Sequence, residues 1–246
     1  MLDNSSVAVF IDAENIPAKY AKEIFDYASN YGNVIIKRIY ADWSKENIQN
    51  WREKIFDYGI IAMQQFSTSS GKNSSDMYLT TEALSIFYEK QIDVFVIVSG
   101  DSDYTSLAQK LRENKKLVIG IGTNKSLKSY VNSFNEFFYL DNEKVKNSDK
   151  DRLKAIPKEQ LKELEQIIDN LIDEKTRAEY AVINTYMQKK YSDFHAKNYG
   201  FSSFRQLIEN FILKHKEYQE KVSDDRCTYY LVKNSTLLRP NKGDID

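Results

Sequence analysis

The stretch Val94–Tyr104 constrains the fold of this chain more than any other part of the sequence. Its first five residues, VFVIV, are continuously apolar and mostly β-branched, which is typical of a strand buried on both faces. The strand runs into the polar sequence SGDSD, and a helical pattern follows. We expect Gly100 to turn the backbone without a Cβ penalty, so that Asp101 and Asp103 follow a strand end. Ligands of an open α/β sheet bind at that edge, although a turn role for Asp101 and a helix-capping role for Asp103 explain the pattern equally well.

Strand and helix patterns alternate over the first 140 residues or so of the 246-residue chain. Apolar runs predict further strands at Val7–Ile11, Val34–Tyr40, Ile60–Phe66, Leu117–Ile121 and Phe137–Leu140. Helical spacing of apolar residues separates them, for example over Ser44–Tyr58. Such alternation predicts an α/β fold with a parallel sheet and right-handed crossovers.

Four aspartates fall in the predicted strand-to-helix loops or at the helix starts after them: Asp12, Asp76, Asp101 and Asp103. Parallel strands bring these loops to one edge, and a sheet with its first and fourth strands adjacent would place Asp12 opposite Asp101. Two carboxylates about 5 Å apart repel by roughly 3 kcal/mol at an effective dielectric near 20, so a cation usually accompanies such a cluster. Oxygen ligands without histidine or cysteine favour Mg²⁺ or Mn²⁺, which support phosphodiester hydrolysis. The pattern favours a nuclease.

Composition limits the alternatives. The net charge of −1 provides no overall field for nucleic acid, so any basic surface must be local. The single cysteine, Cys227, excludes a disulfide framework and fits a reducing compartment. His195 and His215 are too few and too far apart in the sequence for a zinc site, and both are expected on the surface. No apolar run approaches membrane-spanning length, so we expect a soluble, cytoplasmic protein, with homo-oligomer formation left open.

Three motifs follow one another at predicted strand ends: VFIDAEN at Val9–Asn15, GKNSSD at Gly71–Asp76 and VSGDSDY at Val98–Tyr104. Together they make residues 7–140 resemble the NYN domain family of PIN-like nucleases. The resemblance implies a Rossmann-like (PIN-like), three-layer parallel sheet and a metal-dependent ribonuclease. Its metal cluster would be Asp12, Asp76, Asp101 and Asp103. The resemblance also implies that Asn15 and Ser99 shape the site through side-chain hydrogen bonds. Lys72 would contact the substrate phosphate or stabilise developing charge.

Several polar and aromatic residues near these motifs have two possible roles. Glu14 fits a solvated surface residue better than a substrate contact, and Asp42 fits an acidic rim or a turn equally well. Glu82 lies on the helix after Asp76, where it could support the site. Trp43 and Trp51 could stack on bases, although the helical spacing of Trp51 is typical of the core.

The chain becomes charged and poor in apolar residues after Leu140, so we predict a nuclease domain over 1–142 and a linker over 143–157. A second domain follows over 158–233, with a flexible tail over 234–246. Pro157 begins a predicted helix, a second helix ends near Tyr191, and Ser202 or Ser203 caps a third. Strand patterns at 218–222 and 228–232 complete a hairpin, and three helices with a hairpin are the winged-helix arrangement.

The sequences YGFSSF at Tyr199–Phe204 and YYLV at Tyr229–Val232 resemble the LOTUS domain, also called OST-HTH. The resemblance implies RNA binding or a protein partner. Candidate contacts to an RNA backbone are Lys189, Lys190, Lys197, Arg205, Lys214 and Lys216. An ordinary solvated surface, diluted by Glu209, Glu217 and Glu220, fits the same pattern. The module would keep RNA near the nuclease cleft; the main alternative is a catalytically weak or inactive regulator that binds RNA or protein.

Overall fold

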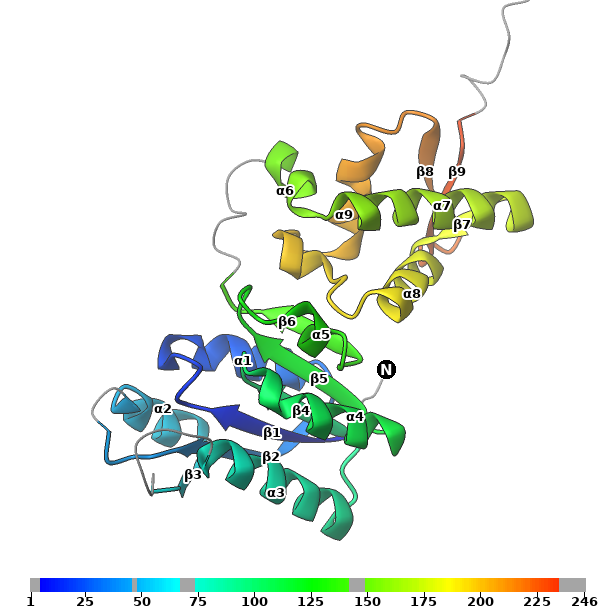
Figure 1. The fold of residues 1–246 in the computed structure, drawn as a ribbon. Coiled ribbons are helices and arrows are strands. Elements are labelled where there is room, and N and C mark those ends of the chain that lie inside the picture. Colours follow the sequence, from blue (N-terminus) through cyan, green and yellow to red (C-terminus); the bar gives the residue numbers. More distant parts are fainter. Residues whose placement is uncertain (1–4, 46–47, 67–73, 142–148, 235–246) are drawn as a thin grey trace, which may run out of the picture. The chain divides into compact units, whose positions relative to one another are not determined.

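The computed structural model describes residues 5–45, 48–66, 74–141 and 149–234 (Figure 1). The chain divides into two compact units, Met1–Asp141 and Asn142–Asp246. Among the residues that the structure describes, no helix is both long enough and apolar enough to cross a membrane.

A six-stranded parallel sheet forms the centre of the first unit (Figure 1). Its strands are β1 (Ser6–Asp12), β2 (Asn33–Ala41), β3 (Ile61–Gln64), β4 (Val94–Val98), β5 (Leu117–Gly122) and β6 (Glu136–Tyr139). Their order is β3-β2-β1-β4-β5-β6. The chain adds β2 and β3 on one side of β1 and then β4, β5 and β6 on the other, so the topological switch point lies between β1 and β4. Ile11 of β1 lies opposite Val98 of β4. The loop after β1 and the loop after β4 therefore begin side by side. The predicted α/β fold is confirmed, and the first and fourth strands are adjacent, which is the condition for Asp12 to lie near the loop after β4.

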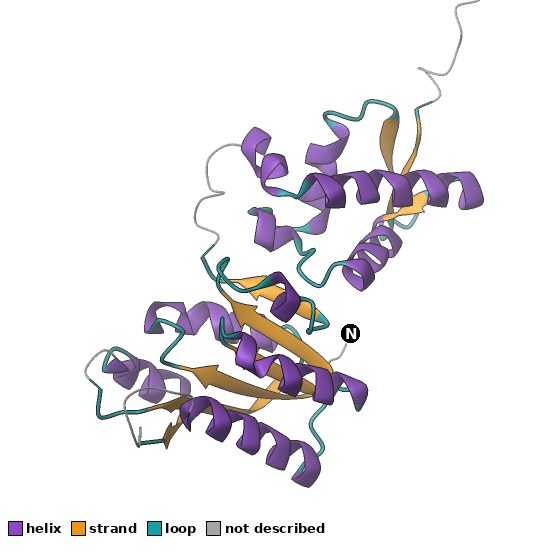
Figure 2. Cartoon of the chain, in the orientation of Figure 1, coloured by secondary structure: helices purple, strands orange, loops and turns teal. Residues whose placement is uncertain are grey.

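Helices cover both faces of this sheet because strand side chains alternate between two apolar clusters (Figure 2). Val7, Val9 and Ile11 pack on one face with α1 (Ala21–Ser29) and α2 (Trp51–Tyr58). Ala8 and Phe10 pack on the other with α3 (Ser74–Glu89), α4 (Thr105–Glu113) and α5 (Lys128–Val131). The three-layer prediction is thereby confirmed. Trp51 is 1 % exposed and donates its Nε1–H to the carbonyl of Ile16 at 2.9 Å, as expected for a core residue.

Two local predictions in the first unit are wrong. Gly100 does not adopt the left-handed conformation, and a Cβ there would meet Ser126 Oγ at 3.4 Å, the edge of ordinary contact. The turn after β4 therefore does not require glycine. The helix predicted from Ser44 begins at Trp51, because Asp42 Oδ1 accepts hydrogen bonds from the backbone N–H and hydroxyl of Ser44 and forms a turn there.

The second unit combines helices with a small antiparallel sheet. Its helices are α6 (Asp149–Ala155), α7 (Lys158–Lys175), α8 (Tyr180–Lys190) and α9 (Phe204–Ile212), and its strands are β7 (Ala178–Glu179), β8 (Tyr218–Val222) and β9 (Tyr229–Lys233). The strand order is β7-β9-β8. Ser203 caps α9, accepting a hydrogen bond from the N–H of Gln206 at 3.2 Å. The predicted hairpin is present, with Val222 opposite Tyr229.

The structure differs from the predicted linker over 143–157 in its second half, where α6 forms. Leu153 and Ile156, three residues apart, are 4 % and 2 % exposed within the apolar cluster of the second unit. Because most of the neighbouring residues are charged, the sequence pattern did not indicate this short apolar face. Residues 142–148 and 235–246, which include most of the predicted tail, lie outside the described residues.

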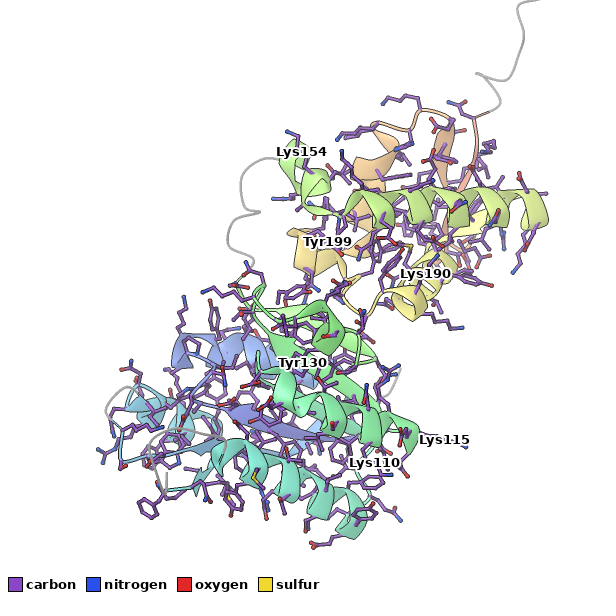
Figure 3. The ribbon with its side chains drawn as sticks, in the orientation of Figure 1. Lys110, Lys115, Tyr130, Lys154, Lys190 and Tyr199 are labelled. Atoms are coloured by element: carbon purple, nitrogen blue, oxygen red, sulfur yellow. The ribbon has the colours of Figure 1, made fainter. Side chains whose placement is uncertain are left out.

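A buried polar network orders the YGF sequence of the second unit (Figure 3). The Tyr199 hydroxyl donates to Gln160 Oε1 at 2.5 Å, and Gln160 Nε2 donates to Asp193 Oδ1 at 3.1 Å. Gly200 has φ +79°, a left-handed conformation that glycine adopts without strain, and Phe201 is 1 % exposed. These residues hold the core of the unit together.

Candidate functional site

Asp12 ends β1 as a buried carboxylate, 1 % exposed, surrounded by hydrogen-bond donors. Its Oδ2 accepts from Asn15 Nδ2 at 2.6 Å and from Ser99 Oγ at 2.9 Å. Its Oδ1 accepts from the backbone N–H groups of Glu14 and Asn15 at 3.1 and 3.3 Å. The structure thus places both predicted site-shaping residues, Asn15 and Ser99, directly on Asp12.

Ser99 connects Asp12 to the loop after β4. Its Oγ accepts a hydrogen bond from the N–H of Asp101 at 3.1 Å, while its own hydroxyl donates to Asp12. Asp101 in turn accepts from the N–H of Asp103 at 3.0 Å and caps the short 3₁₀ helix Ser102–Tyr104. The capping role that the sequence allowed for Asp103 therefore belongs to Asp101. Gly122 of β5 permits this packing, because a Cβ there would lie 2.9 Å from the Ser99 carbonyl oxygen.

Asp76, Asp101 and Asp103 form an acidic cluster at the carboxyl edge of the sheet. Asp76 lies in the first turn of α3, and one oxygen from each of the three carboxylates lies within 4.8 Å of the others. An octahedral Mg²⁺ separates opposite ligand oxygens by about 4.2 Å, so small side-chain adjustments would let one ion contact all three. An all-oxygen set of this kind suits Mg²⁺ or Mn²⁺. Asp12 lies outside this group of three.

Burial and mutual repulsion disfavour the ionised forms of two of these carboxylates. Burial raises the pKa of Asp12 from 3.8 to about 6, although hydrogen bonds from Asn15 and Ser99 oppose the shift and the charge of Asp76 adds to it. Burial also raises the pKa of Asp76, with further increases from the charges of Asp101 and Asp103. A cation would offset these charges, which is the electrostatic condition expected of a metal site.

Tyr104, the last residue of the VSGDSDY motif, is a site residue that was not among those predicted. Its hydroxyl donates to Asp76 Oδ1 at 2.7 Å and lies 3.5 Å from Asp12 Oδ2, so it bridges the two carboxylates. Burial, followed by the charge of Asp12, raises the pKa of Tyr104 and keeps this hydroxyl protonated. The available signal was a tyrosine, with a polar tip, at a buried position directly after SGDSD. Tyr130, labelled in Figure 3, is also buried and donates to the Ser99 carbonyl at 3.3 Å.

The residues with two possible roles are engaged in local structure. Glu14 accepts from Lys45 Nζ at 3.0 Å and from the N–H of Asp42 at 3.2 Å. Asp42 forms the turn at Ser44, and Glu82 pairs with Arg38. Trp43 donates its Nε1–H to the Met63 carbonyl at 3.0 Å, which fixes its ring beside β3. Lys72, the predicted phosphate contact, lies outside the described residues.

The cations predicted to contact RNA differ in how far they are already paired. Arg205 forms ion pairs with Glu209 at 2.8 Å and Glu220 at 3.1 Å, and its guanidinium lies 3.9 Å from the Tyr229 ring centroid. Lys190 (Figure 3) pairs with Glu163 at 2.5 Å. The remaining four are exposed: Lys189, Lys197, Lys214 and Lys216.

Residues 6–141, more than half of the chain, match the NYN domain. The chain belongs to the NYN domain family. Its N-terminal unit is therefore a PIN-like nuclease domain by family, in agreement with the resemblance carried by the three motifs. Residues 151–213 match the OST-HTH/LOTUS domain, in the predicted order. That match begins within α6, which is consistent with the burial of Leu153 in the second unit.

The chain is also similar to proteins without an assigned function. It is 25% identical over 165 residues to an uncharacterised protein of Methanocaldococcus jannaschii, covering 63% of this chain and spanning 65% of that relative. A crystal structure of a protein of unknown function from Vibrio parahaemolyticus is similar with a TM-score of 0.46 and 21% identity, covering 56% of this chain and 94% of that one.

We expect the metal-free NYN protein to lose part of its stability as the pH rises through about 6. The pKa of Asp12 is about 6 in the folded state against an ordinary value of 3.8, so folding binds its proton more tightly. This contribution is complete below pH 3.8, disappears as the pH rises through 6, and amounts to about 3 kcal/mol. Denaturant unfolding with chelator, from about pH 4 to 7.5, should show a larger decline in wild type than in Asp12→Asn, where only the raised pKa of Asp76 contributes from this site.

The matched control for this pH dependence is Asp93→Asn. Asp93 lies at the opposite edge of the sheet, where hydrogen bonds from Ser6 lower its pKa, so its own linkage has the opposite sign. This variant should keep the decline near pH 6. If the unfolding free energies of wild type and Asp12→Asn change with pH in parallel, Asp12 is not the group that causes the decline.

Tyr104→Phe should raise the pKa of Asp76, because the lost hydrogen bond is the contact that lowers it. We expect a loss of about 1 kcal/mol in unfolding free energy, typical of one removed hydrogen bond. Carboxyl-carbon NMR over a pH titration measures the pKa directly. Tyr130→Phe is the control: it removes a buried hydroxyl that bonds a carbonyl, and it should leave the Asp76 titration unchanged. An Asp76 pKa that is the same in all three proteins would rule out the bridging role of Tyr104.

Proposed function

We propose that the NYN unit hydrolyses RNA phosphodiester bonds with a divalent cation, Mg²⁺ or Mn²⁺, held by Asp76, Asp101 and Asp103. The observation that carries this proposal is the convergence of their carboxylate oxygens within 4.8 Å. These side chains come from α3 and from the loop after β4, two segments that only the folded sheet brings together. An RNA phosphate is itself anionic, so this edge would repel the substrate unless a cation were bound.

In this proposal three aspartates hold the cation and Asp12 supports them. A bound cation would activate water and offset charge that develops at phosphorus. Asp76, Asp101 and Asp103 hold the cation, and Asp101 also keeps the Ser102–Tyr104 turn in place through its cap. We include Asp12 because the Tyr104 hydroxyl reaches both Asp12 and Asp76, and a neighbouring cation would lower the Asp12 pKa from about 6. Lys72 completes the set as the phosphate contact that its motif implies.

A catalytically weak RNA- or protein-binding regulator is the second candidate. The observation that favours it is the number of protein donors that already surround Asp12, namely Asn15, Ser99 and two backbone N–H groups. These hydrogen bonds stabilise the carboxylate without any metal, and a protein could use the same site for binding alone.

The OST-HTH/LOTUS unit is proposed to hold RNA near the NYN site through contacts from Lys189, Lys197 and Arg205 to the phosphate backbone. Tethering of this kind raises the effective substrate concentration without requiring base recognition. Lys190 was predicted to join them, and its ion pair with Glu163 reduces its contribution to RNA binding.

Cys227, an exposed free cysteine, is consistent with the cytoplasmic location that we propose.

Asp101→Asn should raise the melting temperature of the metal-free protein and abolish RNA cleavage. The Asn oxygen can still accept from Asp103 N–H, so the change removes charge and keeps the cap. Two carboxylates within 4.8 Å of each other repel by about 3 kcal/mol or more at a dielectric of 20, which solvent exposure reduces to about 1 kcal/mol. Melting temperature is measured with chelator and through Mg²⁺ and Mn²⁺ titrations, which should stabilise wild type far more than the variant. Cleavage of structured and unstructured RNA is followed alongside.

The control for Asp101→Asn is Asp26→Asn, which removes an equal charge from an exposed carboxylate paired with Lys22. It should change neither the metal response nor cleavage. Cleavage that persists with chelator or in Asp101→Asn would contradict the proposed chemistry. RNA binding by wild type without cleavage under any metal condition would favour the regulator.

Lys189→Ala should weaken RNA binding and flatten its salt dependence, and Lys190→Ala should do so less, because a phosphate must first displace Glu163 from Lys190. Both lysines are exposed, but Lys190 is paired with Glu163, while Lys189 lies beside the Tyr186 ring, 6.0 Å from its centroid. Loss of one phosphate contact lowers the slope of log affinity against log salt by roughly 0.7 for a single strand. Binding isotherms at several salt concentrations provide the slopes. Equal slopes for wild type and Lys189→Ala would assign the unit to protein partners.

A further inference from the structure

Glu165, His215 and Glu217 bring three metal-ligating side chains together in the second unit. Glu165 lies on α7, whereas His215 and Glu217 lie on the connection between α9 and β8. One ligand atom from each residue lies within 4.8 Å of the other two. None of the three belongs to the acidic cluster of the NYN unit, and their chemistry differs from it because a nitrogen donor is present.

The imidazole of His215 is held in place before any ligand binds. Its ring stacks on Phe211 with centroids 4.0 Å apart and an interplanar angle of 12°. Its backbone N–H donates to the Phe211 carbonyl at 3.3 Å, and its carbonyl accepts from the N–H of Tyr218 at 3.2 Å. A ring with this orientation already fixed loses little conformational freedom when a ligand binds.

The ring nitrogen Nδ1 faces both carboxylates. It lies 3.1 Å from Glu217 Oε1 and 3.8 Å from Glu165 Oε1. Ligand atoms about 2.1 Å from a tetrahedral metal ion are about 3.4 Å apart, and the two observed distances lie on either side of this value. A hydrogen on Nδ1 can serve one carboxylate well but not both, whereas a dication bonds to all three donors.

We propose that Glu165, His215 and Glu217 form a Zn²⁺ site, with solvent at the fourth position. One imidazole and two carboxylates suit zinc better than Mg²⁺, which prefers oxygen ligands. The three side chains are 43%, 29% and 47% exposed in that order, which leaves room for water to complete the coordination. The ion ties α7 to the start of β8, segments that are separated by about 50 residues in the sequence.

The proposal is tested by NMR of the histidine rings in the full-length protein during a Zn²⁺ titration. The chain contains only two histidines, so His195 is an internal reference for the fold. Zinc should shift the His215 ring signals with 1:1 saturation and leave those of His195 in place, and Mg²⁺ should shift neither. Asp101→Asn should have the same His215 titration midpoint, because the acidic cluster of the NYN unit is not involved.

Glu165→Gln and Glu217→Gln should each raise the zinc concentration at the His215 midpoint at least about 10-fold. Glu209→Gln is the matched control: it removes an exposed carboxylate on α9 that pairs with Arg205, and it should leave the midpoint unchanged. Unshifted His195 signals report that each variant is folded. The proposal is overturned if zinc does not move the His215 signals, or if all three glutamate variants titrate like wild type.

Discussion

The hydrogen bond from Ser99 to Asp12 connects the ends of β1 and β4, and the rest of the site depends on it. Both residues are almost fully buried, at 0% and 1% exposure, so leaving either polar group unpaired would be costly. The same Ser99 oxygen accepts from the N–H of Asp101, so the loop after β4 takes its position from the carboxylate after β1. Strand order makes this possible, since only adjacent strands bring the two ends within hydrogen-bond distance.

The negative charges of Asp12 and Asp76 weaken the folded state, and a bound cation would offset this effect. Burial and neighbouring charges raise the pKa of Asp12 and Asp76, which means that ionising them weakens the folded state. Donors from Asn15, Ser99 and Tyr104 offset part of this effect without removing the negative charge. Active sites often keep such locally unfavourable arrangements, with stability supplied by the surrounding core. Here the core is the double layer of apolar side chains on the sheet.

The strands and the position of the acidic residues after them could be predicted because they follow from local patterns, whereas the order of the strands in the sheet does not. Continuous β-branched runs mark buried strands, and parallel topology places the residues after them at one edge. What could not be predicted depends on contacts between distant segments. Helical spacing accounts for the ring of Tyr104 but not for its hydroxyl, which finds Asp76 only after folding. Likewise, counting histidines misses His215, because its partners are carboxylates, one of them on another helix.

Arg205 shows how a cation of the second unit can be paired in the free protein and still be available for the proposed contact with RNA. Its ion pairs with Glu209 and Glu220 lie at the surface, where such pairs contribute about 0–1 kcal/mol each. A phosphate that displaces them therefore has little stability to overcome and gains a charge-assisted contact. The Tyr229 ring, 3.9 Å from the guanidinium carbon, is a neutral contact that need not be broken in the exchange. Pairing in the free protein would thus limit nonspecific attraction to anions without preventing the proposed contact of Arg205 with RNA.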